Sequence, residues 1–394
     1  MPSEKNSDLL FSKETYNDFS RELSKEVKDY FANNSLNRYA DSFMVIKMCS
    51  CLGVYLALYF FILSGYISLK YSFVLWGLLG VANMMIGTVI FHDAGHNNIS
   101  KVKKINVFFS WLSGVLVGQS PRVWKLQHNR LHHAWPNIEG NDGDVHQPFL
   151  RLSPQQDWRW FHKYQVHYAS FLYLFLNLGM VITRDFRKLV IFRKMNLIKT
   201  NNSLIGSIFG TVALKLVYFF IHLYIPATVL GVSMEIIIGM FLVMCSIEGL
   251  LLSLMFLPNH IMPSCRFPKD RYQSKNWHVH QLQNTTNHSP KNKLTTWVLG
   301  GLNFHIEHHL FPNICHTHLP DIADIVKTLT DKYNLGYNEK KSWIAAIADH
   351  YRMLYLLGNN RKIPPPPSRW QFVATQGGDQ THTRKKKSST PQGL

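Results

Sequence analysis

The chain has 394 residues, of which 46% are hydrophobic and 17% are charged, below the share of about 25% that is usual in soluble proteins. This composition disfavours a pair of soluble domains and favours one membrane domain with polar caps. The formal net charge of +18 is better explained by basic loops beside anionic lipid headgroups than by nucleic-acid binding, because no zinc-finger or RNA-recognition signature is present.

Residues 1–42 are polar and of mixed charge. Phe19, Leu23, Val27 and Tyr30 recur at spacings of three and four, which predicts an amphipathic helix lying on the membrane or on the protein's own cap. No signal-peptide pattern is present, so we expect the first apolar run to remain an uncleaved span. The five cysteines are an odd number and do not indicate a disulfide framework.

Four apolar runs are long enough to cross a bilayer as helices, and they cover residues 43–69, 73–91, 208–231 and 234–257. Lys47 is the only charged residue in the first run, near its end, where the side chain can snorkel to the interface. We predict an all-α integral membrane domain over 43–363, with four transmembrane helices in two hairpins and a cytosolic helical cap. The segment 364–394 begins with prolines and ends basic, which predicts disorder.

The loop 92–208 holds fifteen Lys and Arg against six Asp and Glu, whereas the turn between the last two apolar runs has no basic residue. The positive-inside rule therefore places both termini and this loop in the cytosol. Within the loop, 105–118 and 166–182 are apolar but short, which favours interfacial or re-entrant helices over full spans.

Three clusters of histidines lie on the predicted cytosolic side. They are HDAGH, from His92 to His96, HNRLHH, from His128 to His133, and HIEHH, from His305 to His309. Residues three and four apart on a helix share a face, so each cluster can direct several ring nitrogens to one point. Imidazole binds Fe, Zn, Cu and Ni alike, but seven or more ligands exceed what one tetrahedral zinc uses. The clusters therefore indicate two metal ions.

These motifs resemble the three histidine boxes of membrane fatty acid desaturases. The similarity runs from about residue 90 to 326 and includes WPNIEGNDGDV after the second box and LFPNICHTHLP after the third. It is greatest with the branch that holds front-end and linoleoyl-CoA-desaturase-like enzymes. Front-end enzymes usually carry glutamine where this chain has His305, so front-end regiochemistry does not follow from the motifs alone.

The resemblance implies a set of iron ligands in the three boxes, namely His92, His96, His128, His132, His133, His305, His308 and His309. Related acyl-CoA desaturases add one histidine, with an asparagine four residues earlier that holds a metal-bound water. His288 and Asn284 have that spacing and are predicted to play these parts, the alternative being a polar loop with an incidental histidine. No catalytic residue is expected beyond the metal centre.

Other polar residues near the boxes are open to two interpretations. Asp93, Glu307, Asp142 and Asp144 either orient ligand imidazoles or are merely solvated. His316 and His318 are expected to be supporting or structural residues. The remaining histidines, including His260, show no ligand spacing and are not expected to bind metal.

The resemblance also implies the chemistry. A fatty acyl chain, carried by lipid, coenzyme A or acyl carrier protein, would gain a double bond with O2 as co-substrate at two Fe ions. The N-terminal region lacks the HPGG haem motif, so a separate cytochrome b5 or ferredoxin is expected to supply two electrons.

Two alternatives remain open from the sequence. One is a hydroxylase or ketolase on the same scaffold. The other is a histidine-rich membrane protein that binds or transports metal. A transporter should carry ionisable ligands along its spans, and the spans of this chain are nearly free of them, with His222 and Glu248 as the main candidates.

Overall fold

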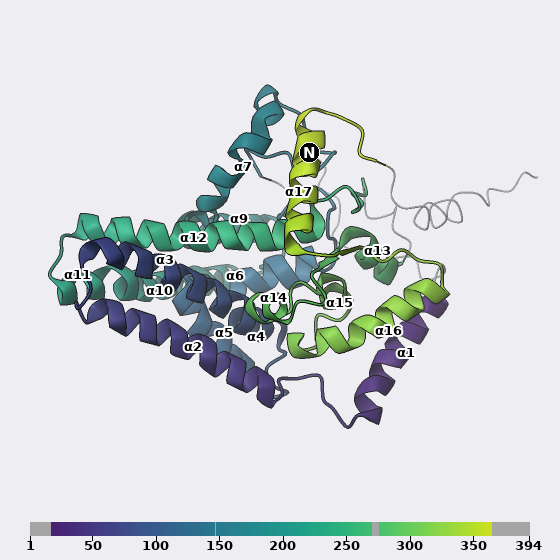
Figure 1. Ribbon diagram of the computed structural model, residues 1–394, viewed down its shortest axis with the longest axis horizontal. Helices are drawn as coiled ribbons and strands as arrows, with labels where there is room; N and C mark the ends of the chain where they lie inside the picture. The colour runs from purple at the N-terminus through teal and green to yellow at the C-terminus, as the bar shows by residue number, and fades with distance from the viewer. Residues whose placement is uncertain (1–16, 146, 270–275, 365–394) are drawn as a thin grey trace, which may run out of the picture.

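The computed structural model describes residues 17–145, 147–269 and 276–364. Within these ranges the protein is mostly helical (Figure 1). The only strands there are β1 (Asn287–His288) and β2 (Glu339–Lys340), which pair in parallel. The predicted all-α class is confirmed.

Four long apolar helical segments form the body of the protein, and each is long and apolar enough to cross a membrane. They are α2 (Ser42–Leu63), the segments Leu69–His96 and Asn201–Leu230, and α12 (Met234–His260). In Figure 1, α2, α3 (Leu69–Met85) and α12 run lengthwise, and α3 contacts both of the others. Each segment overlaps one predicted run, with boundaries that differ by less than two helical turns.

Two of these segments contain a π-helical turn. The π-helix η1 (Ile86–Phe91) joins α3 to α4 (His92–His96), and η5 (Phe220–Tyr224) joins α10 (Asn201–Phe219) to α11 (Ile225–Leu230). π-turns widen a helix locally and occur often at functional sites. The first of them leads directly into the first histidine box.

Lys47 does not snorkel to an interface as predicted. Its side chain is only 2% exposed, and its Nζ lies 2.9 Å from His316 Nε2. The prediction was wrong because the segment around His316 packs over the side chain, buries it and gives it a hydrogen-bond partner inside the protein. An apolar helix tolerates such a lysine when its ammonium group finds a polar partner inside the protein.

The region between the second and third long segments is made of shorter helices. It begins with α5 (Lys103–Val117) and α6 (Pro121–Lys125), which continues as the π-helix η2 (Leu126–His132). The 15 residues of α5 give a length of about 22 Å, short of the roughly 30 Å of a hydrocarbon core.

A bent pair of helices follows, formed by Trp160–Leu174, which includes α7 (Gln165–Leu174), and by Leu176–Lys194, which includes α9 (Asp185–Lys194). The two halves meet at 59°, a geometry that fits a broken span or a re-entrant loop. Lys215 of α10 forms a 3.1 Å ion pair with Asp185, which ties this pair to the third long segment.

The remaining helices gather at the end of the body where α4 and α12 finish (Figure 1). They are α13 (Trp277–Asn284), α14 (Lys293–Val298), α15 (His305–Leu310), the short 3-10 helix η7 (His316–His318), α16 (Leu319–Lys332) and α17 (Trp343–Gly358). The predicted N-terminal amphipathic helix is α1 (Asn17–Asn33). It buries Phe19, Leu23 and Val27 against α16. We call α1 and the helices α13 to α17 the cap, a name that refers only to their place at this end of the protein. Almost all of the predicted disordered tail falls outside the described residues.

Candidate metal centre

The first histidine box lies on α4 and is packed against Trp124 of α6. The Trp124 indole stacks on the His128 ring, with centroids 4.4 Å apart, and meets His92 and His96 edge-on at 5.5 and 5.4 Å. A Cβ atom at Gly95 would collide with the indole ring. Glycine at this position therefore allows α4 and α6 to approach closely enough to bring the first two boxes together.

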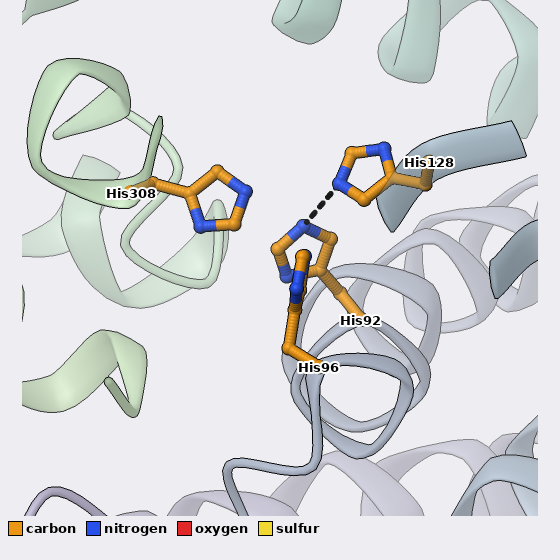
Figure 2. A group of neighbouring side chains, drawn as sticks. All are labelled: His92, His96, His128 and His308. Carbon is orange, nitrogen blue, oxygen red and sulfur yellow. Dashed lines mark hydrogen bonds between the residues drawn. The ribbon is translucent and has the colours of Figure 1, made fainter. Parts of the chain in front are cut away.

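Four imidazoles from all three boxes converge in a first group (Figure 2). One ring nitrogen from each lies within 4.8 Å of the others, and the members are His92, His96, His128 and His308. His92 Nε2 and His128 Nε2 are 3.2 Å apart. The rings come from α4, η2 and α15, which are distant in sequence, so the group exists only in the folded chain.

A second group of four has the same compactness, with its members His132, His260, His305 and His309. His260 Nε2 lies 2.7 Å from His305 Nε2. His260 is the last residue of α12, and its participation was not predicted because it has no histidine neighbours in sequence. Its position at the end of an apolar span, like that of the first box, was the available signal.

His133 lies between the two groups. Its Nε2 is 3.1 Å from His128 Nε2, and its ring centroid is 4.6 Å from that of His308 and 4.3 Å from that of His309. The π-helical geometry of η2 explains this, because the His133 N–H donates to the His128 carbonyl five residues earlier. All eight predicted box histidines thus lie together, and His260 joins them.

The structure does not bring His288 into either group. Its ring is buried in β1, with Nδ1 3.4 Å from Ser289 Oγ and with no hydrogen-bond partner for Nε2 within the described residues. This geometry favours the alternative of an incidental histidine. Asn284 does lie near the centre, where its backbone carbonyl accepts a hydrogen bond of 2.9 Å from His260 Nδ1. A water-holding role for the Asn284 side chain stays a prediction.

Two polar side chains hold rings of the second group through the outer nitrogen. Asp142 accepts a 3.1 Å hydrogen bond from His132 Nδ1, and Gln281 Oε1 lies 2.9 Å from His309 Nδ1. Such contacts fix the tautomer and orientation of a metal-binding imidazole. Asp144 is half-exposed and lies 3.8 Å from the His132 ring, so Asp142 is the orienting carboxylate.

Glu307 of the third box does not touch a ligand ring by hydrogen bonding. Its carboxyl group accepts from Asn287 Nδ2 at 2.7 Å and from the Tyr337 hydroxyl at 2.9 Å. Burial raises the pKa of Glu307 to about 7, although the bond from Asn287 opposes this. His318 donates to a backbone carbonyl, that of Tyr39, and is a structural residue.

Burial keeps most of the box imidazoles neutral. It lowers the pKa well below the usual histidine value at His128, His133, His305, His308 and His309. Burial also disfavours the charged form of His132, but the neighbouring Asp142 carboxylate outweighs it and raises the pKa of that ring. Neutral imidazole is the form that binds metal, so the electrostatics favour a metal site.

The donor atoms fit two transition-metal ions. His96 Nε2, His308 Nε2 and His309 Nε2 are buried and have no hydrogen-bond partner in the part of the chain that the structure describes. Nitrogens at right angles around a metal, each about 2.1 Å away, lie about 3.0 Å apart. The spacings of 2.7, 3.1 and 3.2 Å between facing Nε2 atoms agree with this value. Each group of four can therefore hold one ion.

The same residues fall inside a family match. The model of the fatty acid desaturase family matches residues 69–341, well over half of the chain. The sn-1 linoleoyl-lipid 6-desaturase of Arthrospira platensis is 28% identical over 345 residues, covering 87% of this chain and 93% of that protein. The sn-1 linoleoyl-lipid 6-desaturase of Synechocystis sp. is also 28% identical, over 86% of this chain and 95% of that protein.

A moss relative agrees with these two. The acyl-lipid (8-3)-desaturase of Physcomitrium patens is 29% identical over 86% of this chain and 72% of that protein. Extended similarity to desaturases thus accompanies the two buried histidine groups and the four apolar helices. The chain belongs to the fatty acid desaturase family.

Proposed function

We propose that this membrane oxidoreductase introduces a double bond into the acyl chain of a lipid, using O2 at a di-iron centre held by histidines. The observation that carries the proposal is the pair of adjacent, buried four-histidine groups within a chain of the desaturase family. Unactivated C–H bonds are beyond the acid–base chemistry of side chains, so a metal centre must supply the oxidising power.

Each histidine group would hold one iron. The first ion would be bound by His92, His96, His128 and His308, and the second by His132, His260, His305 and His309. His133 is near enough to both groups to complete either one. When bound, the two ions would supply the oxidising power to remove two hydrogens from adjacent methylene groups.

The protein's own residues keep this site dry and organised. All nine rings are 8% exposed or less, so bulk water is excluded from the centre. Asp142 and Gln281 fix the rings of His132 and His309, and the depressed pKa values keep most other ligands neutral. These features prepare the donor set before metal arrives.

The electron balance requires an outside donor. Reduction of O2 to two waters takes four electrons, of which the two broken C–H bonds supply two. The other two electrons, with two protons, come from elsewhere. We propose a separate one-electron carrier protein of the cytochrome b5 or ferredoxin type.

The names of the relatives favour a lipid-bound substrate. Two are called linoleoyl-lipid desaturases and one an acyl-lipid desaturase. We propose an unsaturated acyl group of a membrane lipid as substrate, in preference to acyl-CoA or acyl carrier protein. The double bond would then be placed at the carboxyl side of an existing one, as the names of the 6-desaturases suggest, even with histidine at position 305.

The membrane topology follows from charge. The basic loops flank the four apolar segments on the side that carries the histidine boxes, which supports an active site and both termini in the cytosol. The metal-transport alternative is less well supported. Among the described residues, His222 is hydrogen-bonded to Tyr55, and Glu248 to Asn83 and Asn177, so neither is hydrogen-bonded there to a box histidine.

Expression in a host whose fatty acids lack polyunsaturation, supplied with linoleate, tests the proposal. Mass spectrometry should locate one new double bond in linoleoyl lipids, and a His308→Ala variant should give none. A hydroxylated or keto product would favour the related scaffold chemistry. A protein that binds two irons and receives electrons, yet leaves every acyl chain unchanged, would refute the desaturase assignment.

A further inference from the structure

A buried chain of three polar side chains runs from a long helix to the first histidine box. Lys47 of α2 lies 2.9 Å from His316 Nε2, and His316 Nδ1 lies 2.9 Å from Asp93 Oδ2. Lys47, His316 and Asp93 are 2%, 3% and 1% exposed. None of the three binds iron in the proposed function, yet each is held in a fixed place within the protein.

The chemistry of the groups gives the chain a direction. An ammonium group only donates hydrogen bonds, so His316 Nε2 must accept from Lys47 and the ring proton lies on Nδ1. His316 Nδ1–H then donates to Asp93 Oδ2. The backbone N–H of His316 and the Cys315 thiol donate to the same oxygen, each at 3.2 Å. Burial and the Lys47 charge lower the pKa of His316, which agrees with a neutral ring, although Asp93 opposes them.

The other carboxylate oxygen faces a ligand. Asp93 Oδ1 is 3.6 Å from His92 Nδ1, and that nitrogen has no hydrogen-bond partner among the described residues. The opposite nitrogen of the ring, Nε2, faces His128 within the first group (Figure 2). A metal-binding histidine commonly directs its outer N–H to a carboxylate. Asp93 is a carboxylate close to the outer nitrogen of His92, and it is therefore suited to accept that hydrogen bond.

We propose that Lys47 and His316 are positioning residues for the first metal site. They hold Asp93 by its Oδ2, so that its Oδ1 stays directed at His92. This inference rests on the proposed metal centre. It extends the centre to a lysine that lies 45 residues before the first box and belongs to another helix.

The alternative is that the chain only fastens α2 to the cap. In that case its loss would lower the stability of the metal-free and metal-loaded protein alike and leave the affinity for iron unchanged. Lys215 offers a matched control, because it is also a buried lysine of a long apolar helix. It pairs with Asp185, which touches no box histidine in the described contacts.

The test measures iron affinity by chelator competition, and thermal stability without metal, on purified full-length protein. Lys47→Met should weaken iron binding measurably, with an upper limit of roughly 10–100-fold, the range for loss of a residue that contacts a metal ligand directly. Lys47→Arg keeps a cationic donor and should recover most of that affinity. Lys215→Met should lower stability and leave iron affinity at the wild-type value.

Wild-type iron affinity in Lys47→Met would overturn the inference, whatever its stability. If that variant does not fold, Lys47→Gln serves instead. Its amide can donate or accept, so the His316 tautomer is no longer fixed and a smaller loss of affinity is expected. Again, unchanged affinity would overturn the inference. A wild-type protein that binds no iron would instead refute the proposed function, so the two failures are distinguishable.

Discussion

His260 and His288 show how little a histidine's sequence neighbours decide its part. His260 has no histidine beside it, yet its ring lies 4.6 to 4.8 Å from three box imidazoles. His288 follows an asparagine at a suggestive spacing, yet it contacts none of those rings in the described structure. His260 differs from His288 because it is the last residue of α12, and this position places its ring between histidines of the second and third boxes.

Replacing His260 with alanine should remove iron from the second site, because that group of four loses one imidazole and the bond from Nδ1 to the Asn284 carbonyl is lost as well. The expected result is about one iron per chain in place of two, with no desaturation. His288→Ala is the matched control and should keep both irons. Elemental analysis of the purified variants measures this. Two irons in His260→Ala and one in His288→Ala would show that His288, and not His260, is the ligand.

At the scale of elements, α4 and α6 meet through a glycine and a tryptophan. Gly95→Ala should displace the Trp124 indole, which stacks on His128, and so lower iron content and activity.

Gly53→Ala in α2 is the control, since its Cβ would meet nothing within 4 Å. Alanine there should raise helix stability by up to about 1 kcal/mol. Thermal unfolding and bound iron, measured together, separate the two effects. Full iron loading in Gly95→Ala would contradict the packing argument.

The elements differ in how far the sequence predicts them. The four long helices and the three boxes were predictable because apolar runs and closely spaced histidines are local signals. The division of the boxes between two groups was not. An α-helical spacing places His128 with His132, whereas the π-turn of η2 pairs His128 with His133 and turns His132 to the second group. Likewise, His308 joins the first group while His305 and His309 join the second.

Long-range partners were equally beyond local reasoning. From the sequence, Lys47 is predicted to snorkel. In the folded protein its side chain instead contacts His316, which the packing of the cap against α2 brings beside it. Asp142 and Asp144 are equivalent in a sequence, and only the turn between the second box and the bent helix pair selects Asp142. Which of these side chains contact one another depends on how distant segments pack together, and hydrophobic periodicity carries no information on that.

At the scale of the whole molecule, the nine histidines are buried, each with 8% or less of its surface exposed. Electrons must therefore reach the centre through the surrounding protein. The 394 residues contain no HPGG haem motif, and the chain carries a formal charge of +18. A basic surface attracts an acidic carrier protein, and this attraction weakens as salt screens it.

We therefore expect the purified, iron-loaded enzyme to give no sustained turnover with NAD(P)H alone. Addition of a cytochrome b5 or a ferredoxin, with its reductase, should start desaturation. With an acidic donor the rate should fall as ionic strength rises from about 0.01 to 0.15 M, over which the Debye length shrinks from about 30 to 8 Å. A neutral chemical reductant in place of the donor is the control, and its rate should not depend on salt. Continued turnover with NAD(P)H and no donor protein would show that electrons enter by another route.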